Sequence, residues 1–210
     1  MKFYPAYLDL RDRLCLVFGG GSVAERKAIS LLDAGAAVTI ISPSLTPKLQ
    51  ALSGSGKIAH RKKEFDESDL AAEFIVAAAT NSAEVNSRIA RACKKRNMLV
   101  NVAVPPEEGN FVVPSVVERG ELLIAISSGG VSPALSKKIR QELETRYGPE
   151  YGTFLNMVAG IRRRVISEVA DERRRREIFQ NIADSEVIEL LRQGKTNEAE
   201  ALLNRIAGQS

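Results

Sequence analysis

The chain has 210 residues, with 30 Lys and Arg against 26 Asp and Glu, which gives a formal net charge of +4. This length allows one sizeable core with a smaller appendage or two small domains, and the near balance of charges gives no reason to expect a nucleic-acid partner. No apolar run is long enough to span a bilayer and no apolar leader with a basic flank is visible, so we expect a cytoplasmic protein without a membrane partner.

The first recognisable element is a strand that ends in three glycines and passes directly into a helix. Residues 14–18 are apolar, and the helical pattern after the glycines continues to Gly35. Gly19, Gly21 and Ala24 match the dinucleotide-binding fingerprint G-x-G-x-x-A, in which a helix N-terminus offers N–H groups to a pyrophosphate. We therefore expect this turn to hold the phosphates of a dinucleotide through Gly19, Gly21, Ser22, Val23 and Ala24.

Strands and helices alternate over the next part of the chain. The pattern predicts strands at 37–43, 57–65, 74–79 and 98–104, and helices at 46–52 and 82–96. The strand at 57–65 has mixed polarity, as is typical of a sheet edge, and Ser82 is a candidate N-cap. Repeated βαβ units predict a parallel, doubly wound α/β sheet.

The end of the second strand bears on the choice of cofactor. Ser42-Pro43-Ser44 stands where the fingerprint usually has an acid for the ribose 2′-hydroxyl, and serine hydroxyls can also bind a ribose. No Arg follows at once to bind a 2′-phosphate, although Lys48 is near, so NAD is favoured over NADP. Ligands bind at the carboxyl ends of parallel strands, and this adds three polar residues to the expected groove, namely Thr80, Asn81 and Asn101.

The pattern changes near residue 105. We expect a loop, then two strands at 111–117 and 121–127 joined by a tight turn, then a helix from Ser132-Pro133 to about residue 146. The remainder is helical, and Ser185 and Thr196 are candidate caps for its last two helices.

Other chemistry-bearing residues carry weaker signals. His60, the only histidine, stands among basic residues and is typical of a solvated surface position, while Cys15 and Cys93 are expected to be buried free thiols. No spacing of His, Cys, Asp or Glu indicates a metal site. The basic clusters 162–164 and 173–176 are either solvated helix faces or a surface for a multiply anionic ligand.

A family resemblance rests on several of these segments together. The run from Arg11 to Lys27 resembles the opening of the dehydrogenase/ferrochelatase part of siroheme synthases and of their stand-alone relatives, the precorrin-2 dehydrogenases. It continues through Asn101-Val102 and the loop Ser127-Ser128-Gly129-Gly130 with Ser132-Pro133, and covers essentially the whole chain in order.

The resemblance implies an architecture and an activity. It implies an α/β Rossmann-like domain over 1–112, a small α+β dimerisation segment over 113–148 and a C-terminal helical domain over 149–210. Members form homodimers and oxidise precorrin-2 to sirohydrochlorin by passing a hydride to NAD, and some also insert iron. The tetrapyrrole substrate carries many carboxylates, which suit the Arg clusters and a substrate-binding loop made of Ser127, Ser128, Gly129 and Gly130.

One position departs from the family pattern. Family members carry an acid where this chain has Val104, and Val can neither move a proton nor ligate iron. Glu107 and Glu108 in the next loop are therefore the candidate catalytic residues, with water as the alternative proton acceptor. The departure also keeps other interpretations open: a tetrapyrrole-binding paralogue with weak or no dehydrogenase activity, a sirohydrochlorin ferrochelatase, and a non-enzymatic dinucleotide sensor.

Overall fold

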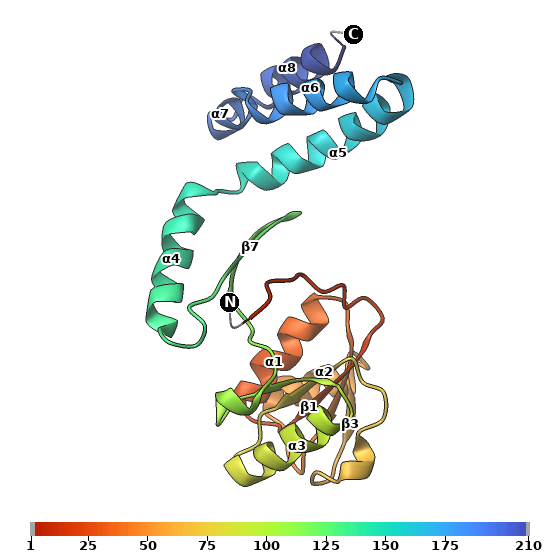
Figure 1. Ribbon diagram of the computed structural model, residues 1–210, viewed down its shortest axis with the longest axis vertical. Coiled ribbons are helices and arrows are strands. Elements are labelled where there is room, and N and C mark those ends of the chain that lie inside the picture. Colours follow the sequence, from red (N-terminus) through yellow and green to blue (C-terminus); the bar gives the residue numbers. More distant parts are fainter. Residues whose placement is uncertain (1–2, 209–210) are drawn as a thin grey trace. The chain divides into compact units, whose positions relative to one another are not determined.

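The computed structural model describes residues 3–208, which divide into two compact units, the first ending at Val113 and the second beginning at Pro114. The first unit holds a five-stranded parallel sheet in the order β3-β2-β1-β4-β5 (Figure 1). Its strands are β1 (Leu14–Phe18), β2 (Ala37–Ile41), β3 (Ala59–Arg61), β4 (Ile75–Ala78) and β5 (Leu99–Val102). The predicted parallel, doubly wound sheet is confirmed, and β3 lies at an edge as its mixed polarity indicated.

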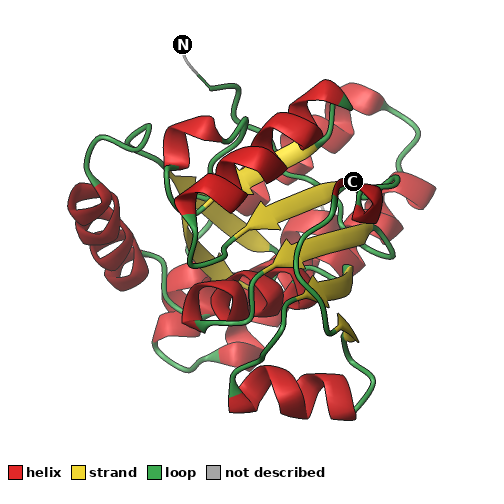
Figure 2. Ribbon diagram, turned by 90° about the horizontal axis from the view of Figure 1, so that it is seen from below, coloured by secondary structure: helices red, strands yellow, loops and turns green. Residues whose placement is uncertain are grey.

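Helices cover both faces of this sheet (Figure 2). Strand side chains alternate between the faces, so Cys15 and Val17 pack on the side of α1 while Leu16 and Phe18 pack on the side of α3. The sequence therefore shows continuous apolar strands rather than a polar–apolar alternation. The helical elements are α1 (Ser22–Asp33), α2 (Pro47–Gly54) and α3 (Ala83–Lys95), with 3₁₀ turns η1 (Glu67–Asp69) and η2 (Pro106–Glu108).

Caps set the ends of these helices. Ser82 Oγ accepts the Val85 N–H at 3.2 Å, which confirms its expected role as the N-cap of α3. The helix expected over 46–52 begins one residue later, because Thr46 is its N-cap and accepts the Leu49 N–H at 3.3 Å. Gly35 follows α1 with a φ of +81°, a left-handed conformation that favours glycine.

The second unit begins with an antiparallel pair of strands and continues as helices. Its elements are β6 (Ser115–Arg119), β7 (Leu122–Ile126), α4 (Pro133–Arg146), α5 (Glu150–Glu168), α6 (Glu172–Ala183), α7 (Val187–Arg192) and α8 (Thr196–Gly208). The expectation of a strand from residue 111 was wrong by four residues: Phe111 and Asn110 belong to the first unit, where both are hydrogen-bonded to β5.

Helices α5 to α8 share a core of their own. Phe154, Ile161 and Val165 of α5 are buried there, with residues of the three later helices. Ser132 caps α4 as expected, but the assignment of Ser185 was wrong, because its hydroxyl donates to the Ile182 carbonyl behind it and α7 begins without a side-chain cap.

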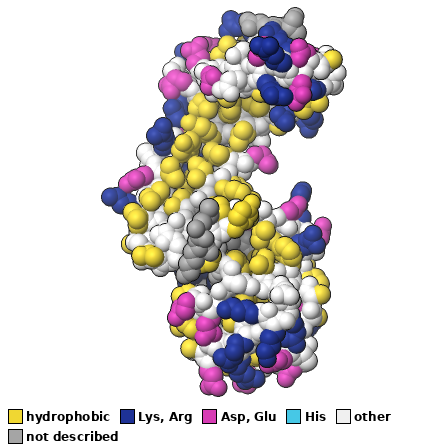
Figure 3. Space-filling model, viewed as in Figure 1, with side chains coloured by type: hydrophobic (Ala, Val, Ile, Leu, Met, Phe, Trp, Pro, Cys, Tyr) yellow, Lys and Arg dark blue, Asp and Glu magenta, His cyan; other side chains and the backbone are white. Residues whose placement is uncertain are grey.

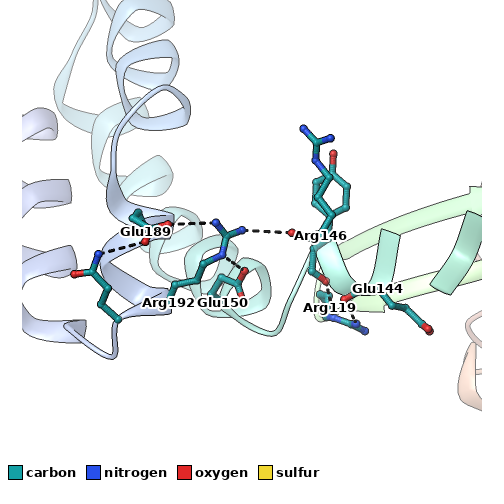
Figure 4. A network of polar contacts seen from close by, with 8 residues as sticks. Arg119, Glu144, Arg146, Glu150, Glu189 and Arg192 are labelled. Carbon is teal, nitrogen blue, oxygen red and sulfur yellow. Dashed lines mark hydrogen bonds and ion pairs between the residues drawn. The ribbon is translucent and has the colours of Figure 1, made fainter. Parts of the chain in front are cut away.

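An arginine joins the ends of three of these helices. Arg192 donates to the Glu150 carboxylate at 2.9 Å, to Glu189 at 3.3 Å and to the Arg146 carbonyl at 3.4 Å (Figure 4). The bond to Glu150 raises the pKa of Arg192, so the guanidinium stays charged. The contacts link the end of α4, the start of α5 and the end of α7.

The second unit also exposes apolar side chains. Hydrophobic residues gather over the part of the chain that carries α4, α5 and β7 (Figure 3). Leu135 of α4 and Ile166 of α5 are 50% and 47% exposed, and Val116 of β6 is exposed as well. Patches of this kind mark surfaces for association. Within residues 3–208, none of the helices combines the length and apolar character needed to cross a membrane.

Candidate functional site

A cavity of about 580 Å³ opens at the carboxyl ends of the strands in the first unit. Such ends are where open α/β sheets bind their ligands. The cavity is lined by the glycine turn, the loop after β2, the segment after β3 and the segment after β4. Its residues are Phe18, Gly19, Gly20, Gly21, Ile41, Ser42, Pro43, Ser44, Leu45, Thr46, Lys63, Glu64, Phe65, Thr80, Asn81, Ser82, Val85 and Arg88.

The three glycines of the turn have different surroundings. A Cβ on Gly19, whose φ is +114°, would lie 2.2 Å from the Ala79 carbonyl oxygen, so glycine is required there. A Cβ on Gly20 would lie 1.8 Å from the Ser44 carbonyl oxygen. A Cβ on Gly21 would meet nothing within 4 Å. The first two glycines thus allow chain segments to pack closely, while the third leaves open space beside the helix N-terminus.

That open space adjoins uncapped backbone N–H groups. Gly21 is the N-cap of α1 and has no side chain to accept from the first turn, and the first N–H groups of a helix have no partners within it. These N–H groups, together with the positive end of the helix dipole, suit an anionic group. The turn therefore fits a pyrophosphate by shape and by charge.

The loop after β2 is held from several sides. Ser42 is buried, donates its N–H to the Arg61 carbonyl at 3.2 Å, and accepts at its own carbonyl from His60 Nε2 at 2.9 Å. The expectation of a solvated His60 was wrong, because parallel pairing of β2 with β3 places its half-buried ring below this loop. A neighbouring hollow of about 310 Å³ is lined by Pro43, Ser44, Leu45, Gln50, Ser53, His60 and Lys62.

A buried asparagine organises the loop after β4. Asn86 of α3 is 1% exposed, and its Oδ1 accepts the N–H and the hydroxyl of Thr80 at 3.0 and 2.8 Å. Its Nδ2 donates to the Thr80 carbonyl at 3.3 Å and to the Val104 carbonyl at 3.0 Å. Asn86 thus fixes the carboxyl ends of β4 and β5 relative to each other.

The sequence did contain a signal for Asn86 that the prediction overlooked. Its position is three residues before Ile89 and seven before Cys93, on the inward face of the helix. A polar residue at such a position needs internal hydrogen-bond partners, and the ends of neighbouring strands supply them.

One end of the cavity is aromatic and basic. Phe65 meets Phe18 edge to face at a centroid distance of 5.0 Å, and the Arg88 guanidinium lies 5.7 Å from the Phe65 ring centroid. Lys63 donates to the Asp69 carboxylate at 2.9 Å. The sequence analysis missed Phe65 and Arg88, because they come from an irregular segment and from the exposed side of α3.

The expected cofactor residues divide between lining and support. Gly19, Gly21, Ser42, Pro43, Ser44, Thr80 and Asn81 line the cavity. Ser22, Val23, Ala24 and Asn101 are not among its lining residues, and Ala24 is fully buried against the sheet.

Asn101 faces α1 instead of the cavity. Its Oδ1 accepts from the Lys27 ammonium group, and its Nδ2 donates to the Phe111 carbonyl at 3.2 Å. Burial lowers the pKa of Lys27, with a smaller contribution from the neighbouring Arg26 charge. This network joins α1, β5 and the segment that leaves the first unit.

The candidate catalytic acids lie just beyond β5. Val104 is 59% exposed and lies two residues beyond the end of β5. Glu107 and Glu108 form η2, after which Asn110 returns along β5 and donates its N–H to the Val100 carbonyl at 2.9 Å. Glu107 is exposed, whereas Glu108 Oε2 is buried and has no hydrogen-bond partner within residues 3–208. Neither lines the cavity.

The expected substrate loop follows β7 in the second unit. Ser127 Oγ accepts the Gly129 N–H at 3.1 Å, and Ser128 Oγ accepts the Ser132 N–H at 3.0 Å. Gly129 and Gly130 have φ values of +65° and +87°. Because the serine oxygens act as acceptors in these bonds, their hydroxyl hydrogens can be donated to a carboxylate.

The cysteines and the other potential metal ligands within residues 3–208 form no second reactive or metal-binding site. Cys15 and Cys93 are free and buried, as expected, and burial raises the pKa of Cys93 to about 12, so its thiol is unreactive. No group of three or more His, Cys, Asp or Glu within residues 3–208 could hold a metal ion.

Three family models match successive parts of the chain. The model described as "Putative NAD(P)-binding" matches residues 6–115. The model described as "Sirohaem biosynthesis protein central" matches residues 119–146, and that described as "Sirohaem synthase dimerisation region" matches residues 150–206.

Known proteins match over nearly the whole chain. A "Siroheme synthase" of Thioalkalivibrio sulfidiphilus is 36% identical over 98% of this chain and 42% of its own length. A "Siroheme synthase" of Methylobacillus flagellatus is 39% identical over 90% of this chain and 41% of its own length. The chain thus spans less than half of these relatives. A solved structure titled "SirC, precorrin-2 dehydrogenase" has a TM-score of 0.81 and 30% identity, and covers 97% of this chain and 100% of its own.

Proposed function

This chain belongs to the SirC-like precorrin-2 dehydrogenase family, which also forms the N-terminal region of siroheme synthases, and we propose that it is an NAD-dependent precorrin-2 dehydrogenase. The reaction removes a hydride and a proton from precorrin-2 and gives sirohydrochlorin. The observation that carries this proposal is the open space at Gly21 beside an uncapped helix N-terminus, in a chain similar over its full length to a precorrin-2 dehydrogenase.

NAD supplies the chemistry by accepting the hydride, and the residues of this chain hold it in place. The N-terminus of α1 would bind the pyrophosphate above Gly21. Ser42 and Ser44 would bind the adenosine ribose, and Thr80 and Asn81 the nicotinamide half. We favour NAD over NADP because Ser42-Pro43-Ser44 is not followed by an arginine, although Lys63 and Arg88 make this choice worth measuring.

The tetrapyrrole carboxylates need donors, and the loop of the second unit has them. The Ser127 and Ser128 hydroxyls and the glycine-rich backbone of this loop would bind carboxylates. We propose a homodimer formed through the second unit, where Leu135 and Ile166 expose apolar surface. Both the strand-and-helix segment over 113–148 and the helices over 149–210 are candidates for the contact.

The substrate proton needs an acceptor in place of the family acid. We propose that Glu107 or Glu108 takes this role, because η2 begins two residues after Val104, in the segment that follows β5. A base acts within hydrogen-bond reach of its proton or through one water. From Glu107, which is exposed, the proton would then pass to solvent.

The exposed Val104 favours one alternative, a paralogue that binds the tetrapyrrole without turning it over. Anaerobic incubation with precorrin-2 and NAD, followed by absorbance, separates these functions. NADH formed together with sirohydrochlorin supports the dehydrogenase. Tetrapyrrole binding without NADH supports the silent paralogue, and NAD binding without tetrapyrrole binding supports a dinucleotide sensor.

A further inference from the structure

The loop that would hold the adenosine ribose is tied to α1 by two residues outside the glycine fingerprint. The Thr46 N–H donates to the Gly20 carbonyl at 2.9 Å, and the Thr46 hydroxyl donates to the Glu25 carboxylate. Glu25 is half-buried in the first turn of α1, and its own N–H donates to the Gly21 carbonyl at 2.9 Å. A single pair of side chains therefore connects the ribose loop to the phosphate-binding turn.

The loop after β2 packs closely against the glycine turn. A Cβ on Gly20 would lie 1.8 Å from the Ser44 carbonyl oxygen and 2.8 Å from Ser42 Oγ, so the backbone of the loop rests directly on the turn. Thr46 lines the cavity, and Glu25 does not. Ser42 is also held by Arg61 and His60, whereas Ser44 is only two residues from Thr46. A shift of Thr46 would therefore displace Ser44 and the hydroxyl that it offers to the ribose.

The charge of Glu25 by itself opposes dinucleotide binding. An acid in the first turn stabilises a free helix, but here the same N-terminus is expected to receive a pyrophosphate, and like charges repel. On electrostatic grounds alone, removal of Glu25 would tighten the binding of NAD. A carboxylate at this position needs another reason, and its bond to Thr46 provides one.

We propose that Glu25 is a positioning residue for the cofactor, which holds the 42–46 loop in its ribose-binding shape through Thr46. The inference rests on the proposed dinucleotide binding. Glu25 touches neither substrate nor cofactor in this account, and its effect is on affinity for NAD and not on the chemical step.

The test measures NAD binding to the full-length chain by calorimetry, without any tetrapyrrole. Glu25→Ala removes the acceptor, and we expect NAD affinity to fall about three- to tenfold, since a lost charge-assisted hydrogen bond is only partly transmitted to the ligand. Glu25→Gln keeps an oxygen that accepts from Thr46, so its affinity should equal or exceed that of the wild type. Asp33→Ala, which removes the exposed acid at the other end of α1, is the matched control and should leave affinity unchanged.

A second pair of variants checks the route through Thr46. Thr46→Val should weaken NAD binding to a similar extent, Thr46→Ser should retain it, and Glu25→Ala should add little in the Thr46→Val background. In turnover assays, Glu25→Ala should raise KM for NAD and leave kcat unchanged.

The outcomes separate this inference from the proposed function. Tighter or unchanged NAD binding in folded Glu25→Ala overturns the positioning role, even if the wild type is an active dehydrogenase. Weaker binding in Glu25→Ala with rescue by Glu25→Gln supports it, even if the wild type shows no turnover. A wild type that binds no NAD overturns both.

Discussion

The two sheets of this molecule differ in how they are buried. In the first unit, helices cover both faces of five parallel strands, and every residue of β4 is buried. In the second unit, Val117 is the only buried residue of β6 and β7, and apolar neighbours such as Val116 remain exposed. A two-stranded sheet is marginally stable alone.

The difference in burial indicates which kind of partner each unit can bind. The first unit has a core on both faces of its sheet and a cavity at the strand ends, which fits a ligand. The second unit leaves apolar surface uncovered along a sheet and two helices, which fits another copy of the chain. The comparison predicts that variants in the first unit change ligand affinity, whereas variants on the exposed surface of the second change assembly.

The largest expected effect is on the ligand site. Gly21→Asp places a carboxylate in the open space where a pyrophosphate would lie, and NAD affinity should fall at least about 100-fold because like charges meet in a partly desolvated site. The fold should tolerate the change, since a Cβ there meets nothing within 4 Å. Calorimetry gives the affinity and thermal unfolding reports the fold.

Gly54 supplies the control for that change. It also has nothing within 4 Å of an added Cβ and lies in the same unit, at the end of α2. Gly54→Asp should bind NAD like the wild type. Equal NAD affinity in a folded Gly21→Asp protein would contradict the cofactor site.

The next effect concerns assembly, and it asks which part of the second unit carries the contact. Leu135 and Ile166 have nearly equal exposure, one on α4 in the 113–148 segment and one on α5 among the helices. A glutamate buried at the contact should weaken the dimer at least about 100-fold, because an unpaired charge loses its solvation. Light scattering of Leu135→Glu and Ile166→Glu at micromolar concentration should show a monomer for whichever residue lies in the contact.

NAD affinity provides the control for assembly. It should be unchanged in both variants if the first unit is self-sufficient. A wild type that remains monomeric and well folded would refute the expectation of a dimer.

A smaller effect is expected on turnover. The double change Glu107→Gln, Glu108→Gln should lower dehydrogenase turnover at least about tenfold while NAD affinity stays the same, since a general base is lost. Val104→Asp should restore much of the loss in that background. Turnover that does not change in the double variant would leave water as the acceptor.

The smallest effect lies within the second unit. Arg192→Ala removes the ion pair that joins α5 and α7, and leaves the mostly buried Glu150 carboxylate without it (Figure 4). The free energy of unfolding of this unit should fall slightly, because water screens the exposed arginine. Chemical denaturation should show no such loss for Arg163→Ala, which removes an exposed arginine of α5.

The burial of the first-unit strands also explains why the sequence predicts them well. The first-unit strands are buried on both faces and follow one another in βαβ order, so local apolar runs and turn residues predict the sheet, its parallel pairing and the glycine turn. Strand ends were less accurate: the strand predicted to reach Val104 ends at Val102. Phe111 resembles the start of the next strand but, like Asn110 before it, is hydrogen-bonded to β5, and only the tertiary contact decides this.

The candidate site, too, could be predicted only where the signal lies in the local sequence and not in tertiary contacts. The fingerprint glycines and serines could be identified because their spacing along the chain carries the signal. Glu25 and Thr46 could not, because their roles arise from a bond between separate elements. Asn86 was overlooked, although its place on the inward face of α3 was a signal in the sequence. His60 resembles a surface residue in sequence, and its bond to the Ser42 carbonyl depends on the pairing of β2 with β3.

We propose that this chain oxidises precorrin-2 although Val104 stands where the resemblance implies an acid, and a single-turnover measurement tests this proposal directly. The protein, in excess over precorrin-2, is mixed anaerobically with NAD while NADH and sirohydrochlorin are followed together. We expect NADH and sirohydrochlorin to appear at the same rate and in equal amounts, and the folded Gly21→Asp variant to form neither. Precorrin-2 that is bound but unchanged by the wild type in the presence of NAD would contradict it.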